Sequence, residues 1–400
     1  MAIKDWAGIA DAVNEKRLLN TLMEMVSIPS PSGEEGKIGR YIGEKCREWG
    51  LDVEVRPVIE DRVNVFITLS GREPGPTFLF NGHLDTEPLA PGWTLDPYKP
   101  FIKDRFLYGS EATNMKAANA SKLEALLTLR ETGALKKGKV VITFVAGECD
   151  KQGIGTQHIV RDGIKADAAL VGEPTNLDVQ TAHANPIQLK VTTHGKPAHQ
   201  AKKEMGICAI QKMMKIINAL DDSIITYTPD PDHSMAPRLN VGWIKGGKFP
   251  STTAPSCEIV VDIRAIPGMT VAGAITDLQN VIELVQKADL DVKASVEEHN
   301  RLPFGPRAAF SISKEARVVQ AANEASGLAQ GKNPAVGPLT PHYYFFWTDA
   351  GLLMQAGIPT VVCGPGVVDQ ENIPDERIEV AQIVQAARIY TMIAAEMTQG

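Results

Sequence analysis

Three apolar stretches of the chain are each followed at once by side chains that bind metals or carry protons. His83, Glu148 and Glu173 stand at or just beyond the ends of these stretches, which are typical of buried strands. The stretches cover residues 77–80, 139–146 and 168–171. Open α/β sheets bind ligands at the carboxyl ends of their strands. Three such ends from one sheet favour a converging site over three solvated loops.

The pair His83 and Asp85 gives the first of these ends its chemistry. In an extended segment, residues two apart point to the same side, so the two side chains share a direction. A metal-binding imidazole is commonly held through its second ring nitrogen by a carboxylate, and Asp85 could serve in that way. Taken alone, the pair is equally well explained as a strand-end histidine capped by a loop aspartate.

Length and composition set the class of protein. A chain of 400 residues with 44% hydrophobic and 22% charged residues is typical of a soluble globular protein, here more simply two domains than one. The formal net charge of −7 argues against a nucleic-acid binder, and no apolar stretch reaches the roughly 20 residues of a membrane-spanning helix. Five scattered cysteines, an odd number, favour free thiols in a cytoplasmic protein.

The periodicity predicts an α/β domain that is interrupted by a second domain. Helical spacing over 5–26 and 34–49 and strands near 51–57, 62–69 and 77–81 open the first domain. The middle of the chain then predicts a strand, a helix, two strands, a helix and a strand, which is the order of a ferredoxin-like domain. These elements are 187–193, 205–220, 238–244, 257–266, 271–287 and 290–296. We therefore expect residues 1–184 and 302–400 to form one domain and residues 185–301 to form an inserted one.

Nine ordered motifs resemble those of a family of co-catalytic metallohydrolases. This family includes aminoacylase, acetylornithine deacetylase, succinyl-diaminopimelate desuccinylase, allantoate amidohydrolase and carboxypeptidase G. The motifs are Asn81-Gly82-His83-Leu84-Asp85-Thr86, Tyr108-Gly109 with Met115-Lys116, Gly147-Glu148, Gly172-Glu173-Pro174-Thr175, His194-Gly195-Lys196-Pro197-Ala198-His199, Asp262-Ile263-Arg264, Thr348-Asp349-Ala350, Gly357-Ile358-Pro359 and Gly364-Pro365-Gly366. The resemblance implies a zinc-exopeptidase-like catalytic domain, with a mixed sheet covered by helices, and an inserted dimerisation or lid domain. It also implies a homodimer and hydrolysis of a C–N bond in a small molecule.

The family pattern implies two metal ions, and this chain departs from it at three ligand positions. It keeps five of the family's functional residues, namely His83, Asp85, Glu148, Glu173 and His199. Asn114 stands where an aspartate bridges the two ions, and Cys149 replaces a glutamate of the second ion. The C-terminal histidine has no counterpart, and the segment 371–376 offers Asn372 in its place.

These departures lead to the hypothesis of a mononuclear site. A bridging carboxylate helps to offset the repulsion between two dications, and one ion has less need of that charge. We expect one divalent ion, Zn or Mn, bound by His83, Asn114 and Glu173, with water completing the shell. Cys149 could add a thiolate, although a small buried thiol is a competing interpretation. On local grounds Asn114 also fits the cap of a helix that runs on through Leu129.

The resemblance also suggests roles for the remaining residues. Glu148 would be the general base, and His199, from the inserted domain, would stabilise an oxyanion, usually in the active site of a neighbouring subunit. Arg264 would bind a substrate carboxylate, or it pairs with Asp262. The aromatic stretch Tyr343-Tyr344-Phe345-Phe346-Trp347, just before Thr348, suggests an aromatic or flat substrate.

Three functions remain open on this basis. The leading one is a metal-dependent hydrolase that cleaves an amide, N-acyl or amine bond of a small carboxylate-bearing molecule. The second is a catalytically silent relative that binds a ligand or a partner. The third is a binuclear deacylase or peptidase that uses Cys149, Asn114 and Asn372 as ligands.

Overall fold

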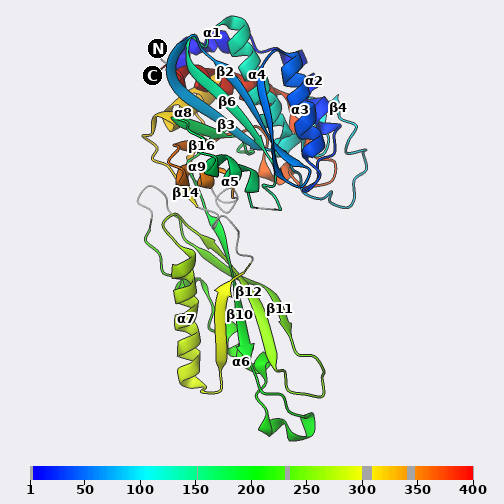
Figure 1. The fold of residues 1–400 in the computed structure, drawn as a ribbon, viewed down its shortest axis with the longest axis vertical. Coiled ribbons are helices and arrows are strands. Elements are labelled where there is room, and N and C mark those ends of the chain that lie inside the picture. The colour runs from blue at the N-terminus through cyan, green and yellow to red at the C-terminus, as the bar shows by residue number, and fades with distance from the viewer. Residues whose placement is uncertain (1–2, 151, 230–234, 300–308, 340–346, 400) are drawn as a thin grey trace. The chain divides into compact units, whose positions relative to one another are not determined.

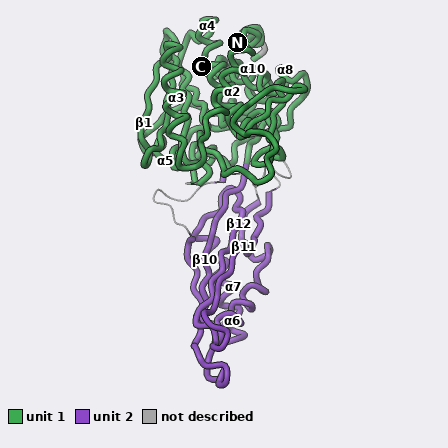
Figure 2. The backbone as a smooth tube through the Cα atoms, turned by 90° about the vertical axis from the view of Figure 1, so that its right-hand side faces the viewer, with its two compact units in different colours: residues 1–182, 310–400 green, residues 183–309 purple. Residues whose placement is uncertain are grey.

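The computed structural model describes residues 3–150, 152–229, 235–299, 309–339 and 347–399. The chain forms two compact units, coloured separately in Figure 2. Unit 1 comprises residues 1–182 and 310–400, and unit 2 comprises residues 183–309. The chain passes from unit 1 to unit 2 after residue 182, two residues before the expected boundary at 184. The expected boundary at 301 falls within 300–308, outside the described residues.

Unit 1 is built on an eight-stranded mixed sheet (Figure 1). In spatial order its strands are β1 (Asp52–Ile59), β2 (Arg62–Ser70), β6 (Lys137–Val145), β3 (Glu73–His83), β7 (Ala168–Val171), β16 (Thr360–Val362), β8 (Val179–Gln180) and β15 (Val336–Gly337). β3 is parallel to both of its neighbours, β6 and β7. The strands that precede the three candidate motifs are therefore adjacent, and their carboxyl ends meet at one edge of the sheet.

Helices cover both faces of this sheet, as the side chains of β3 demonstrate. The consecutive residues Phe80 and Asn81 point to opposite faces. The Phe80 ring lies 5.4 Å from that of Tyr390, in helix α10 (Val380–Met397), whereas the Asn81 amide donates to Thr156 Oγ1, in helix α5 (Ile154–Arg161), at 3.0 Å. The other helices of unit 1 are α1 (Ala7–Ala10), α2 (Glu15–Val26), α3 (Gly36–Glu48), α4 (Ala117–Thr132), α8 (Arg317–Gln330) and α9 (Ala350–Gln355).

The helical spacing over 5–26 is divided between separate elements. A short 3-10 turn (Ile3–Trp6) and α1 precede a break, and α2 begins only at Glu15. Asn14 starts α2, because its side chain accepts a hydrogen bond from the backbone N–H of Arg17 at 3.0 Å. The next helix, α3, is followed by Gly50 at φ 74°, the left-handed conformation that ends helices.

Unit 2 has the expected ferredoxin-like order of elements. Its sheet is antiparallel, in the order β11 (Arg238–Gly246), β12 (Ser256–Ala265), β10 (Asn185–His194) and β13 (Lys293–Glu298), with helices α6 (Ala209–Ile217) and α7 (Val271–Ala288). Along β12 buried residues alternate with partly exposed ones, so one face packs on a hydrophobic core separate from that of unit 1. In the described part of the chain, no helix is long and apolar enough to cross a membrane.

Candidate metal centre

The three strand ends bring their functional side chains to the same edge of the sheet in unit 1. His83 is the last residue of β3, Glu148 lies three residues beyond the end of β6, and Glu173 lies two residues beyond the end of β7. His83 and Glu173 are buried, whereas Glu148 is half-buried. The parallel pairing of β3 with β6 and β7 thus produces the convergence that the sequence predicts.

The two nitrogens of the His83 ring face different surroundings. Nδ1 lies 2.7 Å from the backbone carbonyl oxygen of Asp85. A carbonyl oxygen only accepts hydrogen bonds, so Nδ1 carries the proton of the neutral ring. Nε2 then has a free lone pair, and it is directed towards Asn114 and Glu173.

Asn114 approaches Nε2 with its side-chain oxygen. It lies in the irregular turn η2 (Ala112–Lys116), with φ −120° and ψ 99°, just before α4. Its Oδ1 is 3.1 Å from His83 Nε2, and its Nδ2 donates to Glu371 Oε2 at 2.9 Å. The capping interpretation of Asn114 is wrong, because α4 begins at Ala117 without a side-chain cap and the Asn114 amide is engaged elsewhere.

Glu173 brings a carboxylate to the same point. Its Oε1 lies 3.8 Å from His83 Nε2. Its Oε2 is buried and has no hydrogen-bond partner among the described residues. Burial raises the pKa of Glu173 to about 8, and the nearby charge of His83 opposes this rise. For His83, burial lowers the pKa, but the carboxylates of Glu173 and Asp85 outweigh it and raise the pKa overall.

The arrangement fits a divalent ion. When the His83 ring is neutral and Glu173 is ionised, Nε2, Asn114 Oδ1 and Glu173 Oε1 each have a lone pair that an ion could accept, and both oxygens lie close to Nε2. Two ligands of one Zn ion lie at most about 4.2 Å apart, twice a bond length of about 2.1 Å. Both separations from Nε2, 3.1 and 3.8 Å, are within this limit. The unpartnered oxygen of Glu173 adds a buried acceptor that an ion would satisfy.

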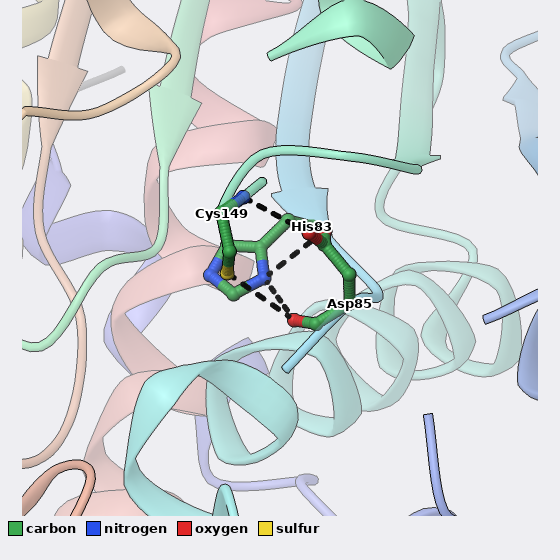
Figure 3. A group of neighbouring side chains, drawn as sticks. All are labelled: His83, Asp85 and Cys149. Atoms are coloured by element: carbon green, nitrogen blue, oxygen red, sulfur yellow. Dashed lines mark hydrogen bonds and ion pairs between the residues drawn. The ribbon is translucent and has the colours of Figure 1, made fainter. Parts of the chain in front are cut away.

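A second group of potential ligands lies on the Nδ1 side of the ring. One ligand atom each of His83, Asp85 and Cys149 lies within 4.8 Å of the others (Figure 3). The Asp85 carboxylate already accepts hydrogen bonds from the backbone N–H groups of Glu148 and Cys149, at 3.0 and 2.9 Å, and from Ser32 Oγ at 3.1 Å. Burial, followed by the charges of Glu148 and Asp85, raises the pKa of the Cys149 thiol far above its ordinary value. This group therefore offers a protonated thiol and a carboxylate with occupied oxygens.

Glu148 is held beside the site through its backbone. The hydrogen bond from its N–H to Asp85 Oδ1 fixes the turn after β6. Its side chain is close enough for its negative charge to raise the pKa of Glu173. A half-buried carboxylate next to the convergent lone pairs is suited to accept a proton from a bound water.

Comparison with known proteins agrees with this geometry. The sequence pattern of Peptidase family M20/M25/M40 matches residues 79–396. The chain is 30% identical over 382 residues to an acetylornithine deacetylase from Proteus mirabilis, which covers 90% of this chain and 91% of the relative. The chain belongs to Peptidase family M20/M25/M40. As a member of this family it is a metal-dependent hydrolase that acts on C–N bonds.

Solved structures of M20 enzymes share the fold. Aminopeptidase PepT from Bacillus cereus has a TM-score of 0.78 at 23% identity and covers 96% of this chain and 99% of its own. The Bacillus subtilis YXEP protein, a dinuclear metal-binding peptidase of the M20 family, has a TM-score of 0.72 at 17% identity and covers 96% of this chain and 98% of its own. At these identities the likeness establishes the fold of the M20 family and not the number of ions.

The site also contains Glu371, which sequence analysis did not select. It belongs to the C-terminal segment in which a family histidine has no counterpart, yet the expected position was its neighbour, Asn372. The Asn372 side chain is exposed, and its backbone is left-handed at φ 56°. Glu371 is the residue that contacts Asn114. Burial raises the pKa of Glu371 to about 7, and the hydrogen bond from Asn114 opposes the rise.

Buried charges beneath the site were missed as well. The Glu376 carboxylate accepts from the backbone N–H groups of Glu111 and Thr113, at 3.0 and 2.7 Å, and so holds the turn that carries Asn114. Lys122 is fully buried and donates to the Asn81 carbonyl at 2.7 Å, and burial lowers its pKa to about 7. The available signal was a lysine among the leucines and alanines of the helix that follows Asn114.

The remaining predicted residues belong to unit 2 or lie outside the described residues. His199 is exposed, and its Nδ1 accepts from the backbone N–H of Ala201 at 3.2 Å. Arg264, on β12, pairs with Asp262 Oδ1 at 2.9 Å. Of the aromatic stretch 343–347, only Trp347 is described, and it is buried.

Proposed function

We propose that this protein hydrolyses a C–N bond of a small carboxylate-bearing molecule with one divalent ion, Zn or Mn. His83, Asn114 and Glu173 would hold the ion. The observation that carries the proposal is the convergence of three lone pairs at His83 Nε2, where the buried Glu173 Oε2 lacks a partner among the described residues.

The positions that would hold a second ion support a single-ion site. At one of them stands Cys149, whose thiol pKa is raised by burial and by the charges of Glu148 and Asp85. At the other, Asn372 is exposed, and the residue that reaches inward is Glu371, whose carboxylate already accepts a hydrogen bond from Asn114.

Each residue has a distinct part in this mechanism. When bound, the ion supplies Lewis-acid polarisation and lowers the pKa of water. Glu148 would take one proton of the attacking water and deliver it to the leaving nitrogen as the C–N bond breaks. The water's oxygen, with the second proton, ends on the carbonyl carbon as the acid product. Asp85 fixes the His83 ring through its carbonyl and the backbone of Glu148 through its carboxylate.

His199 and Arg264 would complete the substrate site. Because His199 Nδ1 accepts a hydrogen bond, the proton of its neutral ring is on Nε2, the state that can donate to a developing oxyanion. In a homodimer, the partner's active site would receive this donor. Arg264 has a carboxylate partner in Asp262, and a substrate carboxylate would share its guanidinium. The relatives named acetylornithine deacetylase make N-acyl amino acids the first substrates to test.

The number of ions per chain is the deciding measurement. Protein purified without chelators is analysed for metals and then titrated with Mn²⁺ and Zn²⁺ after their removal. One ion per chain is the expected result. Two ions would indicate the binuclear deacylase, and none would indicate a silent relative that binds a ligand or partner.

A variant of Glu148 tests the general base. Glu148→Gln should bind the ion as the wild type does but lose turnover by about 100-fold or more on whichever N-acyl amino acid or aromatic amine the wild type cleaves. Glu87→Gln is the matched control, because it removes an exposed carboxylate near the site without touching the turn after β6. Full activity of Glu148→Gln would remove Glu148 from the mechanism.

A further inference from the structure

The Asn114 side chain can offer a metal either an oxygen or an NH₂ group, and only the oxygen can bind an ion. The two ends of an amide have the same shape, so contacts with its neighbours decide which end faces the site. An aspartate at this position would present an oxygen whichever way it turned. A metal site that includes an asparagine therefore needs another group to set the orientation of the amide.

The neighbours of Asn114 differ in what they require. His83 Nε2, with its free lone pair, would accept a hydrogen bond from the amide NH₂ if the amide turned over. In the observed orientation the oxygen lies 3.1 Å from Nε2. When the ring is neutral, as ion binding requires, two lone pairs face each other there, which is unfavourable without an ion between the two atoms. His83 alone would therefore select the orientation that blocks metal binding.

Glu371 selects the opposite orientation. Its ionised carboxylate only accepts hydrogen bonds, and Oε2 lies 2.9 Å from Asn114 Nδ2. A hydrogen bond to a charged group is stronger than one between neutral groups, so this contact can outweigh the preference of His83. Glu371 also places a negative charge one hydrogen bond away from the site, where Asn114 itself has none.

We propose that Glu371 is a positioning residue that holds the Asn114 amide with its oxygen towards His83 and Glu173, so that a neutral side chain serves as a metal ligand. This inference rests on the single-ion site proposed above. It assigns to one residue of the C-terminal segment a role that depends on Asn114 being an amide.

The test compares ion affinities of chelator-treated full-length variants by calorimetric titration with Mn²⁺ and Zn²⁺. Glu371→Met removes the acceptor at similar size, and we expect the Kd to rise by about 10- to 100-fold. Glu371→Gln keeps an acceptor oxygen but makes a weaker, neutral hydrogen bond, so its Kd should rise clearly less than that of Glu371→Met. Asp369→Met, an exposed carboxylate two residues away, is the control for charge alone and should leave the Kd unchanged.

Replacing the amide gives the decisive comparison. In an Asn114→Asp background, Glu371→Met should change the Kd by less than about threefold, because a carboxylate presents an oxygen in either orientation. Thermal unfolding of each ion-free variant checks that the fold is retained.

Three results would overturn the inference. Equal losses of ion affinity in Glu371→Met and Glu371→Gln would mean that Glu371 acts only through its charge. If Glu371→Met lowers the ion affinity equally in the wild-type and Asn114→Asp backgrounds, Glu371 binds the ion directly instead of orienting Asn114. Wild-type protein that takes up no ion would overturn both this inference and the proposed function, whereas the other two results leave the proposed function intact.

Discussion

The two nitrogens of the His83 ring have different neighbours. The residue types near Nδ1 are stronger metal ligands than those near Nε2. Asp85 lies beside Nδ1, and Cys149 lies close to both His83 and Asp85 (Figure 3), and both are residue types that bind metals well. Beside Nε2 lie Asn114, a poorer ligand, and Glu173. Judged by residue type alone, the Nδ1 side would be the metal site.

Hydrogen bonding reverses that judgement. The Asp85 carboxylate is occupied by two backbone N–H groups and the Ser32 hydroxyl, and Cys149 stays protonated. On the Nε2 side the lone pairs face one another and one oxygen of Glu173 is unsatisfied within the described structure. Proximity of ligand residues therefore does not make a metal site unless their lone pairs are free. The Nδ1 side is instead the support that orients the ring.

Glu173→Gln should have the largest effect, because it replaces the carboxylate that lies 3.8 Å from Nε2 while keeping the shape of the side chain. We expect the Kd for Mn²⁺ or Zn²⁺ to rise by about 100-fold, since a neutral amide replaces an ionised ligand. Titration of the ion-free protein measures the change. Affinity within twofold of the wild type would mean that the ion is bound elsewhere.

Asp85→Asn should lower the free energy of unfolding more than a substitution of either Asn114 or Glu173, the candidate ligands on the Nε2 side. The new NH₂ group would face an N–H donor, so at least one of the three hydrogen bonds to residue 85 is lost in a buried position. The free energy of unfolding of the ion-free protein should fall by about 3 kcal/mol. Ser32→Ala removes one of the same bonds and should cost about 1 kcal/mol. A smaller loss for Asp85→Asn than for Ser32→Ala, in urea unfolding, would contradict the supporting role.

Of the two sides of the His83 ring, the Nε2 side should make the stability of the ion-free protein depend on pH between about 5 and 8. Glu173 has a folded pKa of about 8, raised above its ordinary value of 4.5, so its contribution to stability is present at low pH and is lost as the pH rises from about 5 to 8. The raised pKa of His83 acts in the same direction. Ion binding needs both groups deprotonated, so ion affinity should rise over the same range.

Unfolding of chelator-treated protein from pH 5 to 8 measures this slope. Glu173→Gln should reduce this slope, whereas Cys149→Ala should not change it, because the raised pKa of the thiol lies above this range. A slope that is unchanged in Glu173→Gln would exclude Glu173 as its source.

Cys149→Ala should have the smallest effect of these changes on the metal site. Loss of a partly buried sulfur should cost about 1 kcal/mol of stability and change the Kd of the ion by less than about threefold. Titration and urea unfolding of the same preparation give both values. A rise in Kd as large as that of Glu173→Gln would mean that the Cys149 thiolate binds the ion. The two sides of the His83 ring would then both belong to the metal site.

The framework of the site follows from the sequence. Apolar stretches that end at His83, before Glu148 and before Glu173 determine which residues stand at strand ends, because strand length and direction follow from local patterning. The parallel order β6, β3, β7 then brings these ends together. The ferredoxin-like order of unit 2 is predictable in the same way, since each of its elements has its own periodicity.

The free lone pairs, in contrast, can be identified only from the folded chain. The contact between Asn114 and Glu371 joins residues 257 positions apart, and no local spacing selects Glu371 over Asn372. The left-handed turn at Asn372 turns the segment so that the glutamate reaches inward. The occupation of Asp85 by backbone N–H groups is equally non-local. A sequence specifies which groups can bind an ion, but hydrogen bonds made across the fold decide which of them remain available to do so.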